Sequence, residues 1–266
     1  AREVLELHTL GVEGPYDQRD VHELAKLLTG LAATRNHAFK FRQNMIEPGP
    51  KTVLGRTYGA EKGMRAIRKA LNDVALHPST ARHIAHKLVV HFVSDTPPGE
   101  IVSAVEAAYL RTGGDLFACY GALLDHSDAW QPQRPNMRPP EEFVAAALRA
   151  LAPTQTTLEG LKGKAARELF FQPLNLMGQP WMRPTGPDGF AEEDMAWITP
   201  QGISARLEWA MNAPARLLDT LPEPNTFVRT ALGGEVPEAV AFAASAAEDR
   251  QVATGLILSS PAFQRR

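Results

Sequence analysis

The sequence predicts a mainly α-helical protein, a multi-helix array with one small two-stranded β-ribbon and one long loop rich in aromatic residues and proline. Apolar residues recur at spacings of three and four along most of the chain, which is the period of an amphipathic helix. An alternating, period-two pattern is confined to residues 39–54. Residues 171–200 contain five prolines and no sustained period, so they predict the loop.

The composition is that of an ordinary globular protein. Hydrophobic residues make up 44% and charged residues 22% of the 266 residues. The 28 basic and 30 acidic side chains leave a net charge of −2, without the basic cluster that nucleic-acid binding needs. No apolar run reaches about 18 residues, so we expect no transmembrane segment. The single cysteine, Cys119, cannot form an internal disulfide, and its apolar neighbours predict that it lies in the core.

Residues that start and stop helices define the first two helices, which are expected to form a hairpin. The opening helix is in register from Ala1 and stops at Gly11, a residue suited to the position after a helix end. Asp17 caps the second helix, because a carboxylate at this position accepts hydrogen bonds from the free amides of the first turn. Gly30 ends that helix.

The β-ribbon is predicted from the segment that follows. Phe39 and Phe41 alternate with basic residues, and residues 52–54 are extended again. Between them lies the turn sequence Glu-Pro-Gly-Pro at residues 47–50. We therefore expect residues 39–41 and 52–54 to form the two strands.

The remaining helices follow from the same signals. Helical periodicity runs from about Glu61 to Ala75 and breaks before Pro78, because a residue that precedes proline is disfavoured in a helix. Asp115 caps a later helix, and Thr156 or Thr157 caps another, with Glu159 in its first turn. The further helices are expected at residues 79–92, 97–112, 116 onward, 140–151, 157–169, 200–218, 237–247 and 250–258. The chain is predicted to be a single domain over residues 1–266, with a subdomain boundary, if there is one, in the proline-rich residues 131–140.

Two carboxylates near the start of the chain are candidate catalytic residues. Glu3 and Glu6 lie three residues apart on one helix, which brings their Cβ atoms within about 5–6 Å. A retaining glycosidase uses a carboxylate pair at a similar separation. Pairing with a neighbouring Arg or Lys is the common alternative for such a pair on a helix surface. Asp188, in the long loop, is a third candidate carboxylate.

The long loop concentrates aromatic and amide side chains. Gln179, Trp181 and Trp197 suit a site that stacks on a sugar ring or grips a peptide, and together with Arg149 they are the candidate substrate-binding residues. The alternative is a plug of proline and aromatic residues that seals a helical core, and this alternative is favoured.

Three histidines are candidate metal ligands. His83 and His86 lie three apart on one expected helix and His91 follows, so two imidazoles could share a face. The sequence contains no HExxH motif, and histidines that stabilise the helix are the simpler interpretation. The sequence also lacks a Walker loop, a GxGxxG motif and a GxSxG nucleophile elbow. We therefore assign no metal and no cofactor.

Nine sequence motifs resemble, in the same order, the bacterial domain of unknown function 1800. The motifs are REVLELHTLGV (residues 2–12), DVHELAKLLTG (20–30), HPSTARHIAHKL (77–88), FVSDTPP (92–98), GGDL (113–116), PEEFVAAALRAL (140–151), LMGQP (176–180), PDGF (187–190) and WITP (197–200). The chain begins inside one of the family's motifs, so the resemblance implies that it is the carboxy-terminal portion of a longer protein.

The resemblance implies a bacterial, exported protein with a possible partner from the domain of unknown function 1501 family. It establishes no activity. The polar positions that match the family are Arg2, Glu3, Glu6, Asp20, His77, Lys87, Asp95, Asp115, Glu141, Arg149, Gln179 and Asp188. Asp20 and Asp115 have a structural explanation at helix starts, and Lys87, Asp95 and Arg149 are interpreted as members of buried ion pairs between helices.

Two main functional hypotheses remain at this point, beside a third alternative, a metal-dependent enzyme whose other ligands would lie in the segment that the resemblance implies is missing. The first is an exported, non-catalytic helical protein that acts through a partner or a polymer surface, with the aromatic loop as the contact and a saccharide as one possible ligand. The second is a hydrolase of glycosides or esters in which Glu3, Glu6 or Asp188 serves as general acid and as nucleophile or base.

Overall fold

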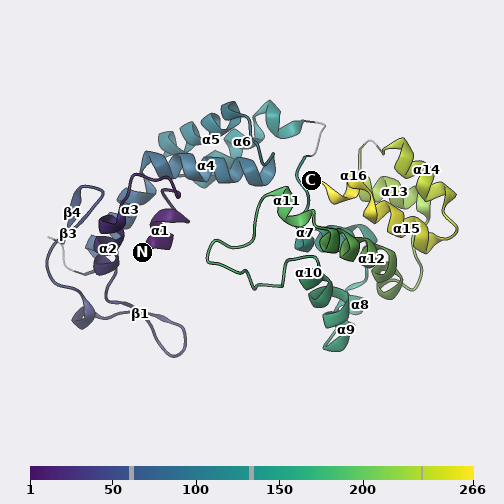
Figure 1. Cartoon of the computed structure of the whole chain (residues 1–266), viewed down its shortest axis with the longest axis horizontal. Helices are drawn as coiled ribbons and strands as arrows, with labels where there is room; N and C mark the ends of the chain where they lie inside the picture. Colours follow the sequence, from purple (N-terminus) through teal and green to yellow (C-terminus); the bar gives the residue numbers. More distant parts are fainter. Residues whose placement is uncertain (60–62, 132–134, 235) are drawn as a thin grey trace. The chain divides into compact units, whose positions relative to one another are not determined.

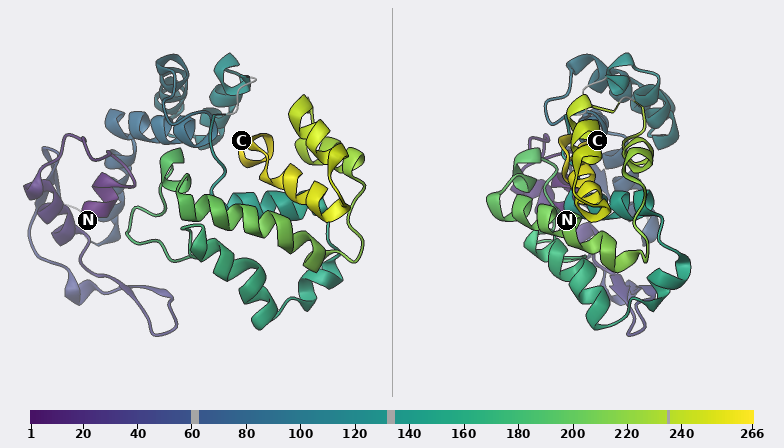
Figure 2. Two further views of the ribbon diagram at one scale, coloured as in Figure 1. Left: turned by 45° about the vertical axis from the view of Figure 1, so that its right-hand side comes forward. Right: turned by 90° about the vertical axis from the view of Figure 1, so that its right-hand side faces the viewer.

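The computed structural model describes residues 1–59, 63–131, 135–234 and 236–266, and the fold is mainly α-helical, as the sequence predicts (Figures 1 and 2). The chain forms two compact units. Unit 1 contains residues 1–92 and 96–131, and unit 2 contains residues 93–95 and 132–266. That the chain is a single domain over residues 1–266, with any subdomain boundary in residues 131–140, stays a prediction. None of the helices in the described part of the chain is both long enough and apolar enough to cross a bilayer.

Unit 1 begins with two helices, α1 (Arg2–Glu6) and α2 (Gln18–Leu27), and α1 ends well before the predicted stop at Gly11. That the two form a hairpin stays a prediction. Asp17 caps α2 in a reciprocal capping box: its carboxylate accepts from the amide of Asp20, and the Asp20 carboxylate accepts from the amide of Asp17. The other Asp20 oxygen accepts from the amide of Leu54 at 2.8 Å, so one side chain joins α2 to the β segment. The apolar core of this part includes the fully buried Leu5 and Leu24.

The predicted β-ribbon is instead two separate antiparallel hairpins. Strand β1 (Leu31–Ala33) pairs with β2 (Phe39–Phe41), and β3 (Lys51–Val53) pairs with β4 (Arg56–Tyr58). The expected pairing of residues 39–41 with 52–54 is therefore wrong. The reason is local: Leu54 and Gly55 both have positive φ angles, 50° and 73°, and so form a two-residue turn that reverses the chain immediately after β3.

The rest of unit 1 is a run of helices in chain order: α3 (Met64–Ala75), α4 (Pro78–Phe92), α5 (Gly99–Thr112), α6 (Leu116–Leu124) and the 3-10 turn η2 (Ser127–Trp130). Asp115 caps α6 as predicted, with its carboxylate 2.9 Å from the amide of Phe117. Cys119 is fully buried, also as predicted, and burial raises the pKa of its thiol. The expected start of α3 at Glu61 falls outside the described residues.

The regular elements of unit 2 in the described residues are helices. Its elements are α7 (Pro140–Leu151), α8 (Gln155–Gly160), α9 (Lys164–Ala166), the π-helical turn η3 (Arg167–Phe171), α10 (Gln172–Leu176), α11 (Asp194–Trp197), α12 (Pro200–Leu217), α13 (Pro224–Leu232), α14 (Glu238–Ala246), α15 (Arg250–Ser259) and α16 (Pro261–Gln264). Helices α12 and α15 lie side by side (Figure 1). The core between them and α7 includes Phe143, whose ring meets that of Trp209 edge to face at 5.5 Å.

Three expectations for the second half are corrected. The helix expected at residues 157–169 is broken: α8 is capped by Thr154, its Oγ1 accepting from the amide of Thr157, and α8 ends at Gly160. The long loop starts at Met177, because η3 and α10 occupy residues 167–176. Helix α13 was missed, although Glu223 caps it and Pro224 occupies its first position.

The proposed buried ion pairs are also corrected. Lys87 and Arg149 are exposed, and neither makes an ion pair within the residues described. Asp95 is partly buried and accepts a hydrogen bond from a backbone amide, that of Asp194. Arg206 of α12 is a buried cation, which donates to the side-chain oxygen of Gln264 at 2.9 Å and to the carbonyl of Arg138 at 2.8 Å. Burial lowers the pKa of Arg206 to about 10.

Candidate functional site

The three candidate carboxylates are all accessible to solvent. Glu3 is exposed on α1, and Glu6 is half-buried and lies 3.7 Å from Arg2 in an ion pair. Asp188 is exposed in the long loop of unit 2. None of them lines the pockets described below. A catalytic carboxylate pair therefore stays a prediction.

The four candidate substrate-binding residues have different environments. Gln179 is buried, and its Oε1 accepts from the amide of Glu141 at 2.7 Å, so it satisfies a free donor at the start of α7. Trp197 is buried against Phe190, with ring centroids 6.5 Å apart. These contacts fit the interpretation of the loop as a plug. Arg149 is exposed on α7, and Trp181 keeps 44% of its surface accessible.

Trp181 lines a surface pocket of about 470 Å³, here called the Trp181 pocket. Three segments contribute to it: η3, α10 and the loop that follows α10. The lining residues are Arg167, Phe171, Gln172, Asn175, Pro180, Trp181 and Arg183. Phe171 and Trp181 meet edge to face with their centroids 6.4 Å apart, so each ring supports the other while both remain partly exposed. The pocket thus combines two aromatic rings, two amides and two guanidinium groups.

The π-helical turn η3 directly precedes α10 and shapes this region. The amide of Gln172 donates to the carbonyl of Arg167, five residues earlier. Pro173 has no N–H, so it cannot donate to the carbonyl of Leu169, its partner in a regular α-helix. The indole Nε1 of Trp209 on α12 takes that place, 2.7 Å from the Leu169 carbonyl. One hydrogen bond therefore attaches the turn that bears Arg167 and Phe171 to the helix beneath it.

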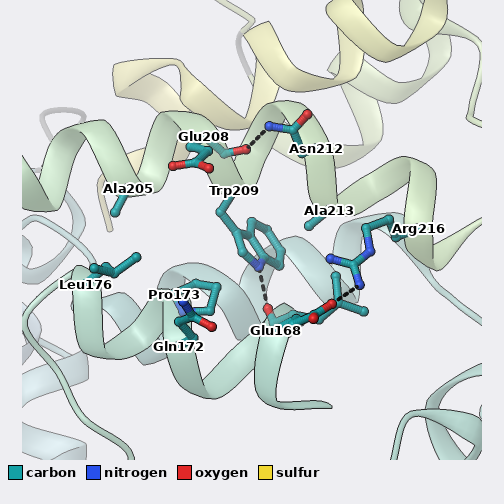
Figure 3. A pocket seen from close by; sticks show the side chains of 11 residues that line it. Glu168, Gln172, Pro173, Leu176, Ala205, Glu208, Trp209, Asn212, Ala213 and Arg216 are labelled. Carbon is teal, nitrogen blue, oxygen red and sulfur yellow. Dashed lines mark hydrogen bonds and ion pairs between the residues drawn. The ribbon is translucent and has the colours of Figure 1, made fainter. Parts of the chain in front are cut away.

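A second hollow of about 210 Å³, here called the α12 groove, lies between η3, α10 and α12 (Figure 3). Gln172 lines both this groove and the Trp181 pocket. At one end of the groove Glu168 forms an ion pair of 3.0 Å with Arg216, and Figure 3 shows the two side chains directed toward each other. Lys164 lies 3.7 Å from the same carboxylate. Glu168 is thus held by two cations.

The arginines of the Trp181 pocket lack such partners. Arg167 and Arg183 are both exposed, and in the described part of the chain neither side chain makes a hydrogen bond or an ion pair. The described residues that line the pocket include no aspartate or glutamate. The pocket therefore carries an uncompensated positive charge, although the whole chain has a net charge of −2.

The family model described as "Protein of unknown function (DUF1800)" matches residues 1–265. This chain belongs to the DUF1800 family. The resemblance in the sequence motifs is thereby confirmed, and the match covers both units of the DUF1800 protein. That the chain is the carboxy-terminal portion of a longer protein stays a prediction. No curated protein and no solved structure matches this DUF1800 chain.

The three candidate metal-ligating histidines of the DUF1800 protein are dispersed along α4. His83 is partly buried with its Nε2 3.2 Å from the carbonyl of Leu7, and burial lowers its pKa. His86 is exposed, and His91 meets the ring of Phe92 edge to face at 4.6 Å. Within the residues described, no three His, Cys, Asp or Glu side chains are grouped as metal ligands.

Unit 1 of the DUF1800 protein has a pocket of its own, of about 390 Å³, beside a buried lysine. Lys51 is 4% exposed, and its Nζ donates to the carbonyls of Glu47, Pro48 and Gly49 at 2.5 to 2.9 Å. All three donors of the ammonium group are therefore used to hold the turn that precedes β3. This arrangement explains Lys51 as a structural residue.

Sequence reasoning found Trp181 but missed the residues around it. Arg167 and Phe171 were placed at or near the end of one long expected helix, and Arg183 had no distinguishing pattern. The useful signal was Pro173, because a proline that directly follows a helical stretch marks a disturbed hydrogen-bond ladder. Recognising it would have indicated irregular backbone at residues 167–171, where the site lies.

Proposed function

We propose that this DUF1800 protein acts through a polymer surface and binds a saccharide polymer at the Trp181 pocket. The observation that carries the proposal is the exposed Trp181, supported by Phe171 and accompanied by the amides of Gln172 and Asn175 in one pocket. A sugar ring presents an apolar face of C–H groups that stacks on an aromatic ring, and hydroxyls that hydrogen-bond to amides. Both kinds of contact are available here.

Binding, rather than hydrolysis, is the chemistry that the pocket supports. Glycoside hydrolysis generally needs two carboxylates on either side of the scissile bond. The described residues that line the Trp181 pocket provide none; the two carboxylates nearby, Glu168 and Glu208, line the adjoining groove instead, and Glu168 is paired with Arg216. The hydrolase hypothesis, with Glu3, Glu6 or Asp188, has its own test in the Discussion.

Export and a protein partner are the further parts of the proposal. The family resemblance implies both, and an exported protein would meet the polysaccharides that lie outside the cell. A partner from the domain of unknown function 1501 family is the other occupant to be tested at the same surface. Cell fractionation of the native bacterium, followed by detection of the protein, tests export directly.

Tryptophan fluorescence offers a direct test of polymer binding. The chain has four tryptophans: Trp197 and Trp209 are buried, and Trp130 and Trp181 are exposed. In a Trp130→Phe background, Trp181 is the exposed reporter. Titration with neutral and acidic polysaccharides is expected to shift or quench its emission. Trp181→Ala lacks this reporter, so its affinity is measured by isothermal titration calorimetry; it should be weaker by about 5-fold to 30-fold, since one stacked aromatic ring contributes about 1–2 kcal/mol.

The matched control is Trp130→Ala, which removes an equally large exposed ring outside the pocket and should leave affinity unchanged. The proposal is contradicted if no polysaccharide changes the emission, or if Trp181→Ala binds as tightly as the unmodified protein. Protection of Trp181 by a purified partner protein, without any saccharide effect, would show that the occupant is a protein.

A further inference from the structure

We infer that the polymer bound at the Trp181 pocket is acidic: a glycan of uronic acid residues whose carboxylates are bound by Arg167 and Arg183. The inference rests on the proposed function and specifies its ligand class. It follows from the charge of the pocket, from the segments that supply that charge, and from the aromatic and amide groups beside it.

The Trp181 pocket has two guanidinium groups and no carboxylate among the described residues that line it. Glu168 follows Arg167 directly in the sequence, yet its carboxylate is bound by Arg216 at 3.0 Å and by Lys164 at 3.7 Å. It therefore does not neutralise Arg167. Arg183 likewise has no carboxylate partner among the described residues. Two guanidinium groups in one pocket are electrostatically complementary to an anion.

The two arginines reach the pocket from different segments. Arg167 begins η3, and Arg183 follows Trp181 by two residues in the loop after α10. A guanidinium group binds a carboxylate through two parallel hydrogen bonds, and this geometry favours arginine over lysine at such sites. Two arginines from separate segments can bind carboxylates on successive units of a chain.

The aromatic and amide groups distinguish a glycan from an acidic peptide. A uronic acid residue has, on one ring, a face that stacks on Trp181, hydroxyls for the amides of Gln172 and Asn175, and a carboxylate for arginine. An acidic peptide supplies the carboxylates without a stacking ring. Gln172 also lines the α12 groove, but that groove carries the carboxylates of Glu168 and Glu208, so the uronate is assigned to the Trp181 pocket and not to the groove.

The test compares one polymer in two charge states. Polygalacturonate carries a carboxylate on each sugar, and its fully methyl-esterified form has the same backbone without the charge. Using Trp181 emission in the full chain carrying Trp130→Phe, at low salt, we expect polygalacturonate to bind at least about 10-fold more tightly than the ester. This preference should decrease as salt is added, because the arginines are exposed.

The discriminating variant is Arg167→Gln/Arg183→Gln, which should reduce the preference for the acid form to less than about two-fold. The control variant, Arg82→Gln/Arg229→Gln, removes the same charge from exposed positions that line neither hollow and should keep the preference. Arg183→Gln alone, in a loop, keeps the test informative if the double variant is unstable in thermal melts. It should lose part of the preference.

The outcomes separate this inference from the proposed function. If both forms of the polymer bind equally and Trp181→Ala weakens both, the polymer-binding function stands and the acidic glycan is wrong. If neither form binds, and no other polysaccharide does, both are wrong. Polyglutamate is the third probe: binding as tight as that of polygalacturonate would overturn the glycan and indicate an acidic protein segment instead.

Discussion

The carboxylate of Asp95 accepts a hydrogen bond of 2.7 Å from the backbone amide of Asp194, the first residue of α11. The Asp194 carboxylate in turn accepts from the amide of Met137 at 2.6 Å, and Met137 forms a β-bridge with Arg265. Four segments of unit 2 that are distant in sequence are thereby joined through two acidic side chains. Burial raises the pKa of Asp194, and the negative charge of Asp95 adds to this shift.

The first prediction concerns the pH dependence of stability that Asp194 produces. Because its pKa is higher in the folded protein, folding favours the protonated form. The stabilising contribution is therefore fully present below the ordinary pKa of 3.8 and is lost as the pH rises through the raised folded pKa. Asp194→Asn imitates the protonated side chain and keeps the acceptor for Met137. At pH 7 we expect it to raise the melting temperature by about 2 °C.

Thermal melts of the variant and the unmodified protein between pH 3 and 7 check this prediction, and the difference should shrink toward the acid end. Asp219→Asn removes a charge of the same sign from an exposed position of unit 2 and serves as the control. A less stable Asp194→Asn at neutral pH would show that Arg265 and Arg266 outweigh burial in their effect on the ionised carboxylate.

The second prediction separates two glutamines by role. Gln179 is buried and caps α7 through Glu141, whereas Gln172 is exposed and lines both hollows. Gln179→Ala should cost about 1 kcal/mol, equivalent to about 3 °C, because a helix-start amide loses its acceptor. Gln172→Ala should leave stability nearly unchanged and weaken polymer binding.

Melting temperatures and polysaccharide affinities, both measured on each variant, show which glutamine is structural and which binds the polymer. Loss of binding by a stable Gln179→Ala would instead support the sequence-based assignment of Gln179 to the substrate. The same result for both glutamines would mean that the cap and the pocket are coupled.

Several helix starts were predictable because a single residue determines them. Asp17 and Asp115 cap α2 and α6 as expected, because a carboxylate at that position meets the free amides whatever else surrounds it. The pairing of strands was not predictable. Leu54 lacks the Asn or Asp that usually signals a tight hairpin turn, yet it adopts a positive φ of 50° beside Gly55.

The candidate site was predictable only in part, because it depends on irregular backbone and on a contact between residues distant in sequence. Trp181 could be identified from the composition of its loop, but its partners come from η3, which replaces part of an expected regular helix. The charge of the pocket depends on Glu168 turning to Arg216, 48 residues further along the chain. This ion pair is a tertiary contact, and no sequence pattern around Arg167 or Arg183 predicts it.

The third prediction addresses the hydrolase hypothesis. Glu3 is exposed and Glu6 pairs with the exposed Arg2, so Glu3→Gln and Glu6→Gln should each change the free energy of unfolding by less than about 0.5 kcal/mol. Both variants should therefore remain folded and suitable for assay. Chromogenic glycosides and short-chain esters are the substrates, with and without a chelator. We expect no turnover by the unmodified protein, and turnover that disappears in Glu3→Gln at unchanged melting temperature would establish the hydrolase.

The last prediction concerns the hydrogen bond between Trp209 and Leu169, which holds η3 to α12. Trp209→Phe leaves the Leu169 carbonyl without its indole donor and also reduces packing, so it should cost about 2–3 kcal/mol. Pro173→Ala returns an N–H that can donate to the same carbonyl. In that background the cost of Trp209→Phe should fall by at least about 0.5 kcal/mol, since the loss of packing is common to both backgrounds.

Urea unfolding of the four proteins in this double-mutant cycle measures the coupling directly. Additive costs would mean that Pro173 and Trp209 act independently and that the π-helical turn has another cause. A positive coupling would establish that the proline frees the carbonyl that Trp209 binds. Trp181 emission in the same variants, each carrying Trp130→Phe, then reports whether the Trp181 pocket requires the π-helical turn, because Arg167 and Phe171 both lie on it.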